Sequence, residues 1–345
     1  MSASANIPVI DISGDPTEVS KALVDAAEDH GFIYIKNIGR DISPEDIDGA
    51  FKTSEKIFGL PLEEKQKYAI GVDNRGWTGM HSEILDPDSQ KVGDFKEAFN
   101  FGEFKDGKAQ QPLPPAIAGD EEQIKKFTDS CHFLCKKILH LLGLGLGVDD
   151  FFSSAHERAK GTSGTTLRLL RYPPPETTNH TAGDMRAGAH SDYGSITLLF
   201  RLKGQAGLEI LKKDNTWAPV PVCPPGTESD PSPPILINIA DLLSYWTNGL
   251  FRSTVHRVVF NDDGKADIAG ETSTGPRYSI AFFCHPVGKT PLEPVPSQRV
   301  KDFKPTDAAP NLNPYAERKM LTADEHLLMR LSATYVGVYE KNSTS

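Results

Sequence analysis

A histidine and an aspartate stand two positions apart, directly before a stretch with strong strand character. They are His190 and Asp192, and the run that follows, Ser195 to Phe200, is rich in β-branched and aromatic residues. In an extended backbone, side chains at positions i and i+2 lie on the same side, so this imidazole and this carboxylate can converge on one point. They supply two ligands of a metal site, and a fold that uses them must bring a third ligand to the same face from another strand.

The candidate for the third ligand is His256, in the segment FRSTVHRVVF. Two imidazoles and one carboxylate on one face of a metal, with the opposite positions open, suit a non-haem Fe(II) oxygenase. On its own, a His-x-Asp pair in a chain with ten histidines also fits a structural hydrogen bond or ordinary surface chemistry. A second, independent sequence feature is therefore needed to favour the metal site over these alternatives.

That signal lies in the segment Pro276 to Phe283, which alternates as a strand and places Arg277 and Ser279 on one face. A guanidinium fork and a neighbouring hydroxyl suit a carboxylate, because the fork binds both oxygens and the hydroxyl supplies a further donor. A buried arginine without such an anion would be costly. The pair therefore predicts a ligand or cosubstrate that carries a carboxylate.

Several segments, in one fixed order, extend this pattern over nearly the whole chain. They are IPVIDISG (7–14), HGFIYIKNIG (30–39), FGLPLEEKQKY (58–68), DFKEAFNFG (94–102), LRLLRYPPP (167–175), HSDYGSITLLF (190–200), STVHRVV (253–259) and RYSIAFF (277–283). In this combination the sequence resembles the Fe(II)/2-oxoglutarate-dependent dioxygenases, specifically the isopenicillin-N-synthase-like branch and, within it, the fungal thymine-dioxygenase-like group. The resemblance is specific because independent segments carry it together.

The resemblance implies roles for the metal and cosubstrate residues one by one. His190, Asp192 and His256 match the iron ligands, and Arg277 and Ser279 match the pair that binds the distal carboxylate of 2-oxoglutarate. The implied cofactors are Fe(II), 2-oxoglutarate as cosubstrate and O2, with ascorbate as a supporting reductant. No catalytic residue beyond the metal centre is expected.

The resemblance also implies one further cosubstrate contact and a substrate wall. Tyr172, before the proline run, matches a tyrosine that often reaches 2-oxoglutarate in the family, although plant relatives have asparagine where this chain has Leu170. In the thymine-dioxygenase-like group the residues matching Arg168, Tyr193 and Phe283 form part of the substrate wall. Core packing is the alternative for each; Arg168 fits it least, because a guanidinium on the inner face of a strand needs a partner.

The activity that the resemblance implies is oxidation of a small organic molecule, such as a secondary metabolite or a nucleobase, with release of succinate and CO2. Hydroxylation is the expected reaction, and desaturation or ring closure are further outcomes of the same chemistry. Two alternatives stay open. One is a non-haem iron oxidase that works without 2-oxoglutarate and uses Arg277 and Ser279 to hold a substrate carboxylate. The other is a non-catalytic jelly-roll binding protein.

The hydrophobic pattern changes after residue 164 from a helical period to a period of two. Strands are expected at 165–172, 187–191, 195–201, 207–211, 217–220, 235–239, 254–260 and 277–284. Such a series of short strands is typical of a double-sheet jelly roll. We therefore expect an α+β fold in one globular unit: an N-terminal scaffold of helices and strands (1–164), a dioxygenase core built as a double-stranded β-helix with flanking α-helices (165–321), and a C-terminal helix and tail (322–345).

Outside this core the pattern predicts helices at 16–28, 44–59 and 120–142. Residues 69–92 show no sustained period and are predicted to be a loop that can close over a pocket. In the C-terminal helix, Leu327, Leu328 and Leu331 are expected on one face.

Charge and cysteine content bear on partners and location. A net charge of −10 and the absence of a basic stripe argue against a nucleic-acid partner. The four cysteines form no CxxC pair, and no apolar leader or membrane span is visible, so a cytoplasmic protein is expected. The expected partner is a small-molecule substrate, and the sequence leaves monomer and homodimer equally open.

Overall fold

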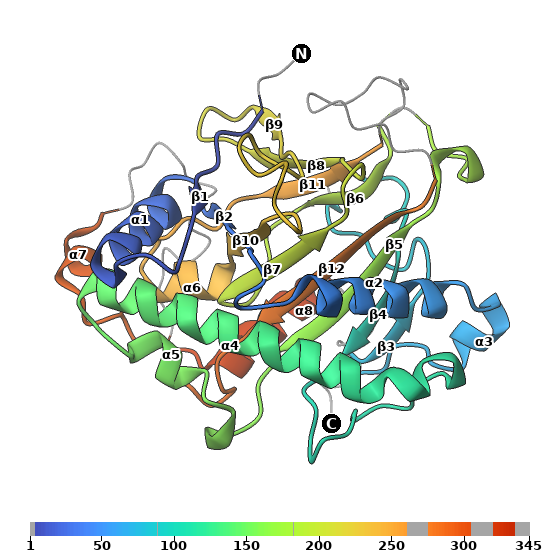
Figure 1. Ribbon diagram of the computed structural model, residues 1–345, viewed down its shortest axis with the longest axis horizontal. Helices are drawn as coiled ribbons and strands as arrows, with labels where there is room; N and C mark the ends of the chain where they lie inside the picture. The colour runs from blue at the N-terminus through green and yellow to red at the C-terminus, as the bar shows by residue number, and fades with distance from the viewer. Residues whose placement is uncertain (1–3, 88, 182, 261–274, 305–319, 335–345) are drawn as a thin grey trace.

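The computed structural model describes residues 4–87, 89–181, 183–260, 275–304 and 320–334, and its chain forms two sheets flanked by helices (Figure 1). The large sheet has the strand order β1 (Val9–Ile10), β2 (Phe32–Ile35), β10 (Ile235–Ile239), β7 (Ile196–Arg201), β12 (Arg277–Cys284), β5 (Thr166–Tyr172), β4 (Glu97–Phe101) and β3 (Gly76–Thr78). The small sheet has the order β6 (Met185–His190), β11 (His256–Val259), β8 (Leu208–Leu211) and β9 (Trp217–Pro219). The fold is therefore of mixed α and β content.

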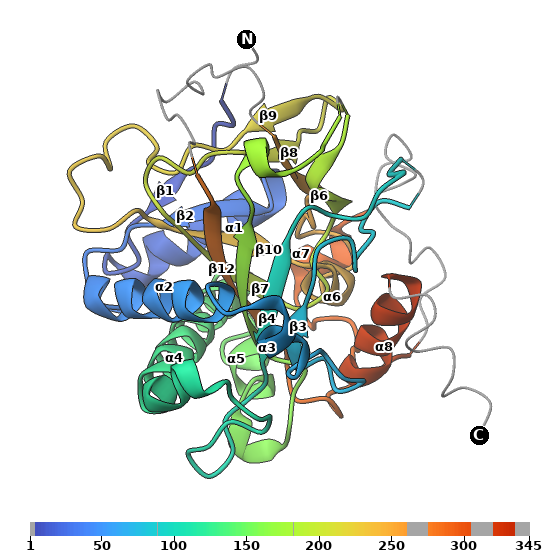
Figure 2. The ribbon, with the colours of Figure 1, turned by 90° about the vertical axis from the view of Figure 1, so that its right-hand side faces the viewer.

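Three long helices cover one face of the large sheet: α1 (Pro16–Asp29), α2 (Pro44–Phe58) and α4 (Glu121–Leu146). In Figure 2, α2 and α4 lie on one side of that sheet and α8 (Ala323–Thr334) lies on the other. Shorter helices complete the chain: α3 (Leu62–Gln66), α5 (Phe151–Ala155), α6 (Asp241–Trp246), α7 (Gln298–Asp302) and the 3-10 turns η1 (Pro115–Asp120), η2 (Arg158–Lys160) and η3 (Pro175–Thr177). Among the described residues no helix combines the length and the apolar character needed to span a bilayer.

Local sequence explains where the first two long helices begin. Asp15 caps α1 by accepting hydrogen bonds from the backbone amides of Thr17 and Glu18, and Ser43 caps α2 by accepting one from the amide of Asp46. Each helix has proline in its first turn, where the missing amide proton costs nothing. These caps set the starting residues of the two helices, and the buried apolar residues of each helix pack it against the sheet.

Alternation along the central strands divides the large sheet into a helix face and an inner face. On β12, Ile280 and Phe282 belong to the core beneath the helices, whereas Ala281 belongs to the core between the sheets. Arg277 and Ser279 therefore share the inner face with Ala281. Polar side chains here face the space between the sheets, and this space becomes the site.

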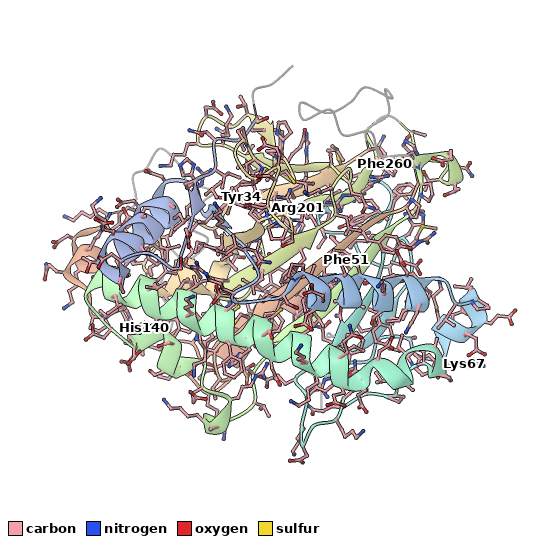
Figure 3. All side chains as sticks on the ribbon, in the orientation of Figure 1. Tyr34, Phe51, Lys67, His140, Arg201 and Phe260 are labelled. Atoms are coloured by element: carbon pink, nitrogen blue, oxygen red, sulfur yellow. The ribbon has the colours of Figure 1, made fainter. Side chains whose placement is uncertain are left out.

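The two sheets are joined by a polar contact that involves Tyr34 and Arg201, two residues that lie close together in Figure 3. Arg201 Nη2 donates to the carbonyl oxygen of Pro221 at 2.9 Å, and the Tyr34 hydroxyl donates to the same oxygen. Pro221 follows β9 of the small sheet, so this contact links β2 and β7 to that sheet. The side chains of Tyr34 and Arg201 are buried, so these hydrogen bonds also satisfy polar groups that the interior would otherwise leave unpaired.

Most expected elements are confirmed, with three differences. Residues 76–78, expected in a loop, form β3, because their amides and carbonyls pair with β4. Helix α4 continues past the predicted end to Leu146 and stops at Gly147, whose φ of 69° favours glycine. Leu328 is 54% exposed instead of sharing the buried face of α8. The predicted tail after residue 334 lies outside the described residues.

Candidate metal centre and cavity

Two neighbouring strands of the small sheet bring the predicted histidines together. In the antiparallel pairing of β6 with β11, His190 is the register partner of His256. Their ring centroids are 4.3 Å apart. Asp192 follows β6, and one ligand atom from each of the three residues lies within 4.8 Å of the others, a group that could hold a metal ion. Strand pairing thus supplies the third ligand that the sequence pattern required.

Backbone hydrogen bonds orient both imidazoles. Nδ1 of His190 lies 2.7 Å from the carbonyl oxygen of Gly188, and Nδ1 of His256 lies 3.2 Å from that of Thr254. A carbonyl oxygen only accepts, so each Nδ1 carries the proton and each Nε2 presents a lone pair. The Nε2 atoms lie 3.8 Å (His190) and 3.7 Å (His256) from Oδ1 of Asp192. The unprotonated nitrogens are thus the ones that converge.

The two carboxylate oxygens of Asp192 make different contacts. Its Oδ2 accepts hydrogen bonds from the Thr197 hydroxyl and from the Asn238 side-chain amide, both at 2.7 Å. Its Oδ1 faces the histidines. Second partners of this kind fix a ligand's orientation and are typical of metal sites.

Electrostatics favours the forms of these side chains that bind a metal. Burial and the neighbouring His256 lower the pKa of His190 to about 4, so its imidazole is neutral at neutral pH. Burial alone would raise the pKa of Asp192, but the two imidazoles and the hydrogen bonds from Thr197 and Asn238 outweigh it and lower that pKa. Imidazole nitrogens with free lone pairs and an ionised carboxylate are the donor set expected for Fe(II).

The predicted carboxylate anchors lie on the large sheet. Arg277 is 1% exposed, and its Nε donates to the carbonyl oxygens of Ala206 and Gln205 at 2.9 and 3.2 Å. Its guanidinium carbon lies 4.8 Å from the ring centroid of Tyr172, its register partner on β5. Nη1 is buried and has no hydrogen-bond partner among the described residues. Ser279 is also buried, two residues along the same face.

Arg168 forms an ion pair with a carboxylate, as expected for a guanidinium on the inner face of β5. Its Nη2 donates to Oε1 of Glu83, which comes from the segment between β3 and β4. Oε2 of Glu83 lies 3.0 Å from Nζ of Lys96, and Lys96 also contacts the carboxylate of Asp94. We call Glu83, Asp94, Lys96 and Arg168 the buried ionic cluster. Burial opposes ionisation of Glu83, but Arg168 and Lys96 outweigh it and hold its pKa well below the ordinary value.

The buried ionic cluster is hydrogen-bonded to β6, the strand that ends at His190. Oδ1 of Asp94 accepts a 3.0 Å hydrogen bond from the backbone amide of Gly188, two residues before His190 on β6. The segment after β3, predicted to be a closing loop, therefore packs against the site through buried charges rather than as a free flap.

One cavity of about 1080 Å³, its open mouth included, connects these groups. All the residues that the sequence predicted for the site line it: Arg168, Tyr172, His190, Asp192, Tyr193, His256, Arg277, Ser279 and Phe283. Tyr193 lies beneath α8, with the guanidinium carbon of Arg330 4.9 Å from its ring centroid. Sequence reasoning missed further lining residues, among them Lys96, Asn74, Asn100, His285, Leu327 and Leu331.

Family comparisons agree with this geometry. Residues 7–120 match the family model "non-haem dioxygenase in morphine synthesis N-terminal", and residues 164–286 match "2OG-Fe(II) oxygenase superfamily". The UPF0676 protein C1494.01 of Schizosaccharomyces pombe is 39% identical over 314 residues, covering 88% of this chain and 90% of that protein. The chain belongs to the 2OG-Fe(II) oxygenase superfamily. It is accordingly a 2-oxoglutarate-dependent dioxygenase, with Fe(II) and 2-oxoglutarate as its cofactors.

Solved structures of the superfamily have the same fold. The full-length thymine 7-hydroxylase of Neurospora crassa, in complex with alpha-KG and 5-formyluracil, is 30% identical and has a TM-score of 0.74, over 97% of this chain and 100% of that one. A putative oxygenase of this superfamily from Caulobacter crescentus is 28% identical, with a TM-score of 0.73 over 96% of this chain and 99% of that one. Among curated proteins, the 2-oxoglutarate-dependent dioxygenase frbA of a Dothideomycetidae fungus is 29% identical, over 93% of this chain and 94% of that protein.

Proposed function

We propose that His190, Asp192 and His256 hold Fe(II) through two Nε2 atoms and Oδ1. The orientation of these atoms carries the proposal. Both Nδ1 protons and the second carboxylate oxygen are already used in hydrogen bonds, and the three remaining donor atoms converge within 4.8 Å of one another, where they are available to a metal ion. Three ligands on one face leave the opposite positions for other molecules.

We further propose that Arg277, Ser279 and Tyr172 bind the distal carboxylate of 2-oxoglutarate. The buried Nη1 of Arg277 lacks a partner among the described residues, and a carboxylate would satisfy it with a charge-assisted hydrogen bond. Leu170 lies opposite Ser279 in the β5–β12 register, so the position where plant relatives have asparagine contributes an apolar wall beside the anchor.

Bound Fe(II), 2-oxoglutarate and O2 supply oxidation of a substrate C–H bond, coupled to formation of succinate and CO2. The protein's own part is orientation. Strands β6 and β11 set the imidazoles, Thr197 and Asn238 set the carboxylate, and Arg277 sets the cosubstrate. Apolar side chains such as Leu327 and Phe283 line the same cavity and exclude water from it.

We infer that the substrate is a small organic molecule without formal charge, such as a nucleobase or a neutral secondary metabolite, and that Arg168, Tyr193 and Phe283 contact it. The buried ionic cluster supports this, because its two cations are matched by two carboxylates. A further uncompensated charge beside it would be costly to bury. The thymine 7-hydroxylase of Neurospora crassa, in complex with alpha-KG and thymine in one crystal structure, is 29% identical with a TM-score of 0.75. Hydroxylation is the proposed reaction.

We also interpret residues 165–321 as a double-stranded β-helix, with 1–164 as the scaffold and 322–345 as the C-terminal element. Strands from this range form the small sheet (β6, β11, β8, β9) and the centre of the large one (β10, β7, β12, β5). The scaffold adds β1 and β2 at one edge and β4 and β3 at the other. This division into two facing sets of strands is that expected of a jelly roll.

Substrate-triggered succinate release tests the function. The enzyme would be given Fe(II), ascorbate, O2 and 2-oxoglutarate with a panel of nucleobases, neutral secondary metabolites and matched carboxylic acids. We expect succinate above the substrate-free background with a neutral compound, together with an oxidised product. Stimulation by the carboxylic acids alone would contradict the inferred substrate class.

A further inference from the structure

One carboxylate outside the predicted metal ligands contacts both segments that carry them. Asp241, the first residue of α6, is buried, with 9% of its side chain exposed. Its Oδ2 accepts a 3.0 Å hydrogen bond from the hydroxyl of Ser191, which lies between His190 and Asp192 in the sequence. Its Oδ1 accepts a 2.6 Å hydrogen bond from the hydroxyl of Ser253, three residues before His256. Asp241 thus bridges the segment after β6 and the segment before β11.

Backbone hydrogen bonds make this bridge rigid. The amide of Asp241 donates to the carbonyl oxygen of Asp192 at 2.8 Å. On either side, Ala240 donates to Ser195 and Leu242 donates to Gly194, both at 3.0 Å. The start of α6 is therefore hydrogen-bonded to the turn that follows Asp192. A displacement of Asp241 would displace the backbone of Asp192 as well.

The negative charge of Asp241 is paired with a positive charge on the C-terminal helix α8. Arg330 of α8 places Nη2 2.8 Å from Oδ2 of Asp241, and its guanidinium lies over the ring of Tyr193. The same helix supplies Leu327 and Leu331 to the cavity. A charge-assisted contact to a largely buried carboxylate fixes the carboxylate's position as well as neutralising it. Figure 2 shows α8 packed on the side of the molecule away from α2 and α4.

We propose that Asp241 and Arg330 are positioning residues of the metal centre: Asp241 holds the two ligand-bearing segments in register, and Arg330 holds Asp241. The proposal rests on the metal site proposed above. Neither residue is among the three proposed ligands, so both act through Ser191, Ser253 and the backbone of Asp192. The C-terminal helix is then part of the metal site's support as well as a wall of the cavity.

Titration of the metal-free protein with Mn(II), followed by calorimetry, tests this without turnover. We expect Asp241→Asn to weaken Mn(II) binding about tenfold to a hundredfold, the usual effect of losing a partner that orients metal ligands. Arg330→Met should weaken binding by a smaller factor, and Arg330→Lys should recover part of that loss because it keeps the charge. In the double variant, the two effects should be less than additive in free energy, since both act through one carboxylate.

Two controls separate positioning from general stability. Arg299→Met breaks partly exposed ion pairs of α7 with Asp25 and Glu28, and Leu328→Ala changes the exposed face of α8; both should keep the original Mn(II) affinity. If Asp241→Asn does not fold, Ser191→Ala and Ser253→Ala each remove one hydrogen bond and should each weaken Mn(II) binding. A lower melting temperature with unchanged affinity in these variants would overturn the proposal.

The outcome also distinguishes this proposal from the one on which it rests. His190→Ala should abolish Mn(II) binding. If it does and Asp241→Asn binds Mn(II) normally, only the positioning role is wrong. If His190→Ala binds Mn(II) normally, the metal site itself is misplaced and both proposals fail.

Discussion

The hydroxyl of Thr197 donates a 2.7 Å hydrogen bond to Oδ2 of Asp192, while Oδ1 of the same carboxylate faces the two histidines. The two oxygens therefore have separate roles, and the first can be disturbed without touching the second. This separation gives a way to examine the orientation of the metal ligand apart from its presence.

Thr197→Val keeps the shape of the side chain and removes the donor. We expect Fe(II) or Mn(II) affinity to fall about tenfold to a hundredfold, because Asp192 loses one of its two orienting partners. Equilibrium titration of the metal-free variant measures this. Thr166→Val is the matched control, since Thr166 also lines the cavity but its hydroxyl contacts the carbonyl oxygen of Gly164. Equal affinity in both variants would contradict the role of Thr197.

Asp192→Ala should lose metal binding and turnover together. Two neutral imidazoles supply neither the charge nor the third ligand that holds a divalent ion on an open face. Metal content after reconstitution and succinate release would be measured on the same sample. Near-normal iron content in this variant would remove Asp192 from the metal site.

Arg277→Lys should weaken 2-oxoglutarate binding. Lysine keeps the positive charge but loses the planar fork, so one of two parallel hydrogen bonds disappears. A charge-assisted hydrogen bond contributes about 1.5 to 3 kcal/mol, which corresponds to about a tenfold to hundredfold loss of affinity. Anaerobic titration of 2-oxoglutarate measures it, with Arg257→Lys, at an ion pair with Glu209, as the control. A defect confined to the prime substrate would instead favour an oxidase that holds a substrate carboxylate at Arg277.

Arg168→Lys should weaken binding of the prime substrate rather than of 2-oxoglutarate. It should weaken binding of the substrate found in the panel and leave the Kd of 2-oxoglutarate near its original value, because Arg168 contacts Glu83 rather than the cosubstrate anchors. The control is Arg171→Lys on the same strand, whose partner is Glu97 and which does not line the cavity. If Arg168→Lys weakens 2-oxoglutarate and spares the substrate, the assignment of Arg168 to the substrate wall is wrong.

The metal-free protein should lose stability as the pH falls from about 6.5 towards 4. Burial is the main cause that lowers the pKa values of four buried histidines, to about 3 for His132 and His285 and about 4 for His156 and His326. In this window the unfolded chain binds protons at these side chains and the folded chain does not, so acid favours unfolding. Each histidine contributes a slope of up to about 1.4 kcal/mol per pH unit.

Denaturant unfolding of the metal-free protein at pH 7.5 and pH 5.5 measures this slope. His156→Gln should make it shallower, because that position no longer titrates. Leu328→Ala, on the exposed face of α8, removes no titrating group; it is the control and should leave the slope unchanged. A slope that is the same in the His156 variant as in the parent would show that His156 does not stay neutral in the folded protein.

The sequence predicted the main elements, and the shared face of Arg277 and Ser279, because a strand period of two is a local property. Once β12 is a strand, Arg277, Ser279 and Phe283 must share a face, and the structure places all three in the cavity. Arg168 and Tyr172, which the resemblance to the family indicated, both lie on β5 and line the same cavity. These predictions needed no knowledge of which strands pair.

The supporting residues were not predicted, because their roles depend on pairing between distant segments. Asn238 contacts Asp192 across 46 positions, and Glu83 contacts Arg168 across 85. Two local signals were present: Thr197 and Asn238 are polar residues on the inner faces of largely apolar strands, ITLLFR and ILINI. A buried polar side chain in such a strand needs a partner, and here the partner is Asp192, the proposed metal ligand.

The proposed metal ligands stand on the small sheet and at its edge, whereas the proposed carboxylate anchors stand on the large sheet. Neither sheet alone therefore carries both the proposed metal ligands and the proposed carboxylate anchors. If the sheets parted, the proposed metal ligands would be separated from the carboxylate anchors, and Asp192 would lose its contacts with Thr197 and Asn238 of the large sheet, so consumption of the cosubstrate depends on an intact interior.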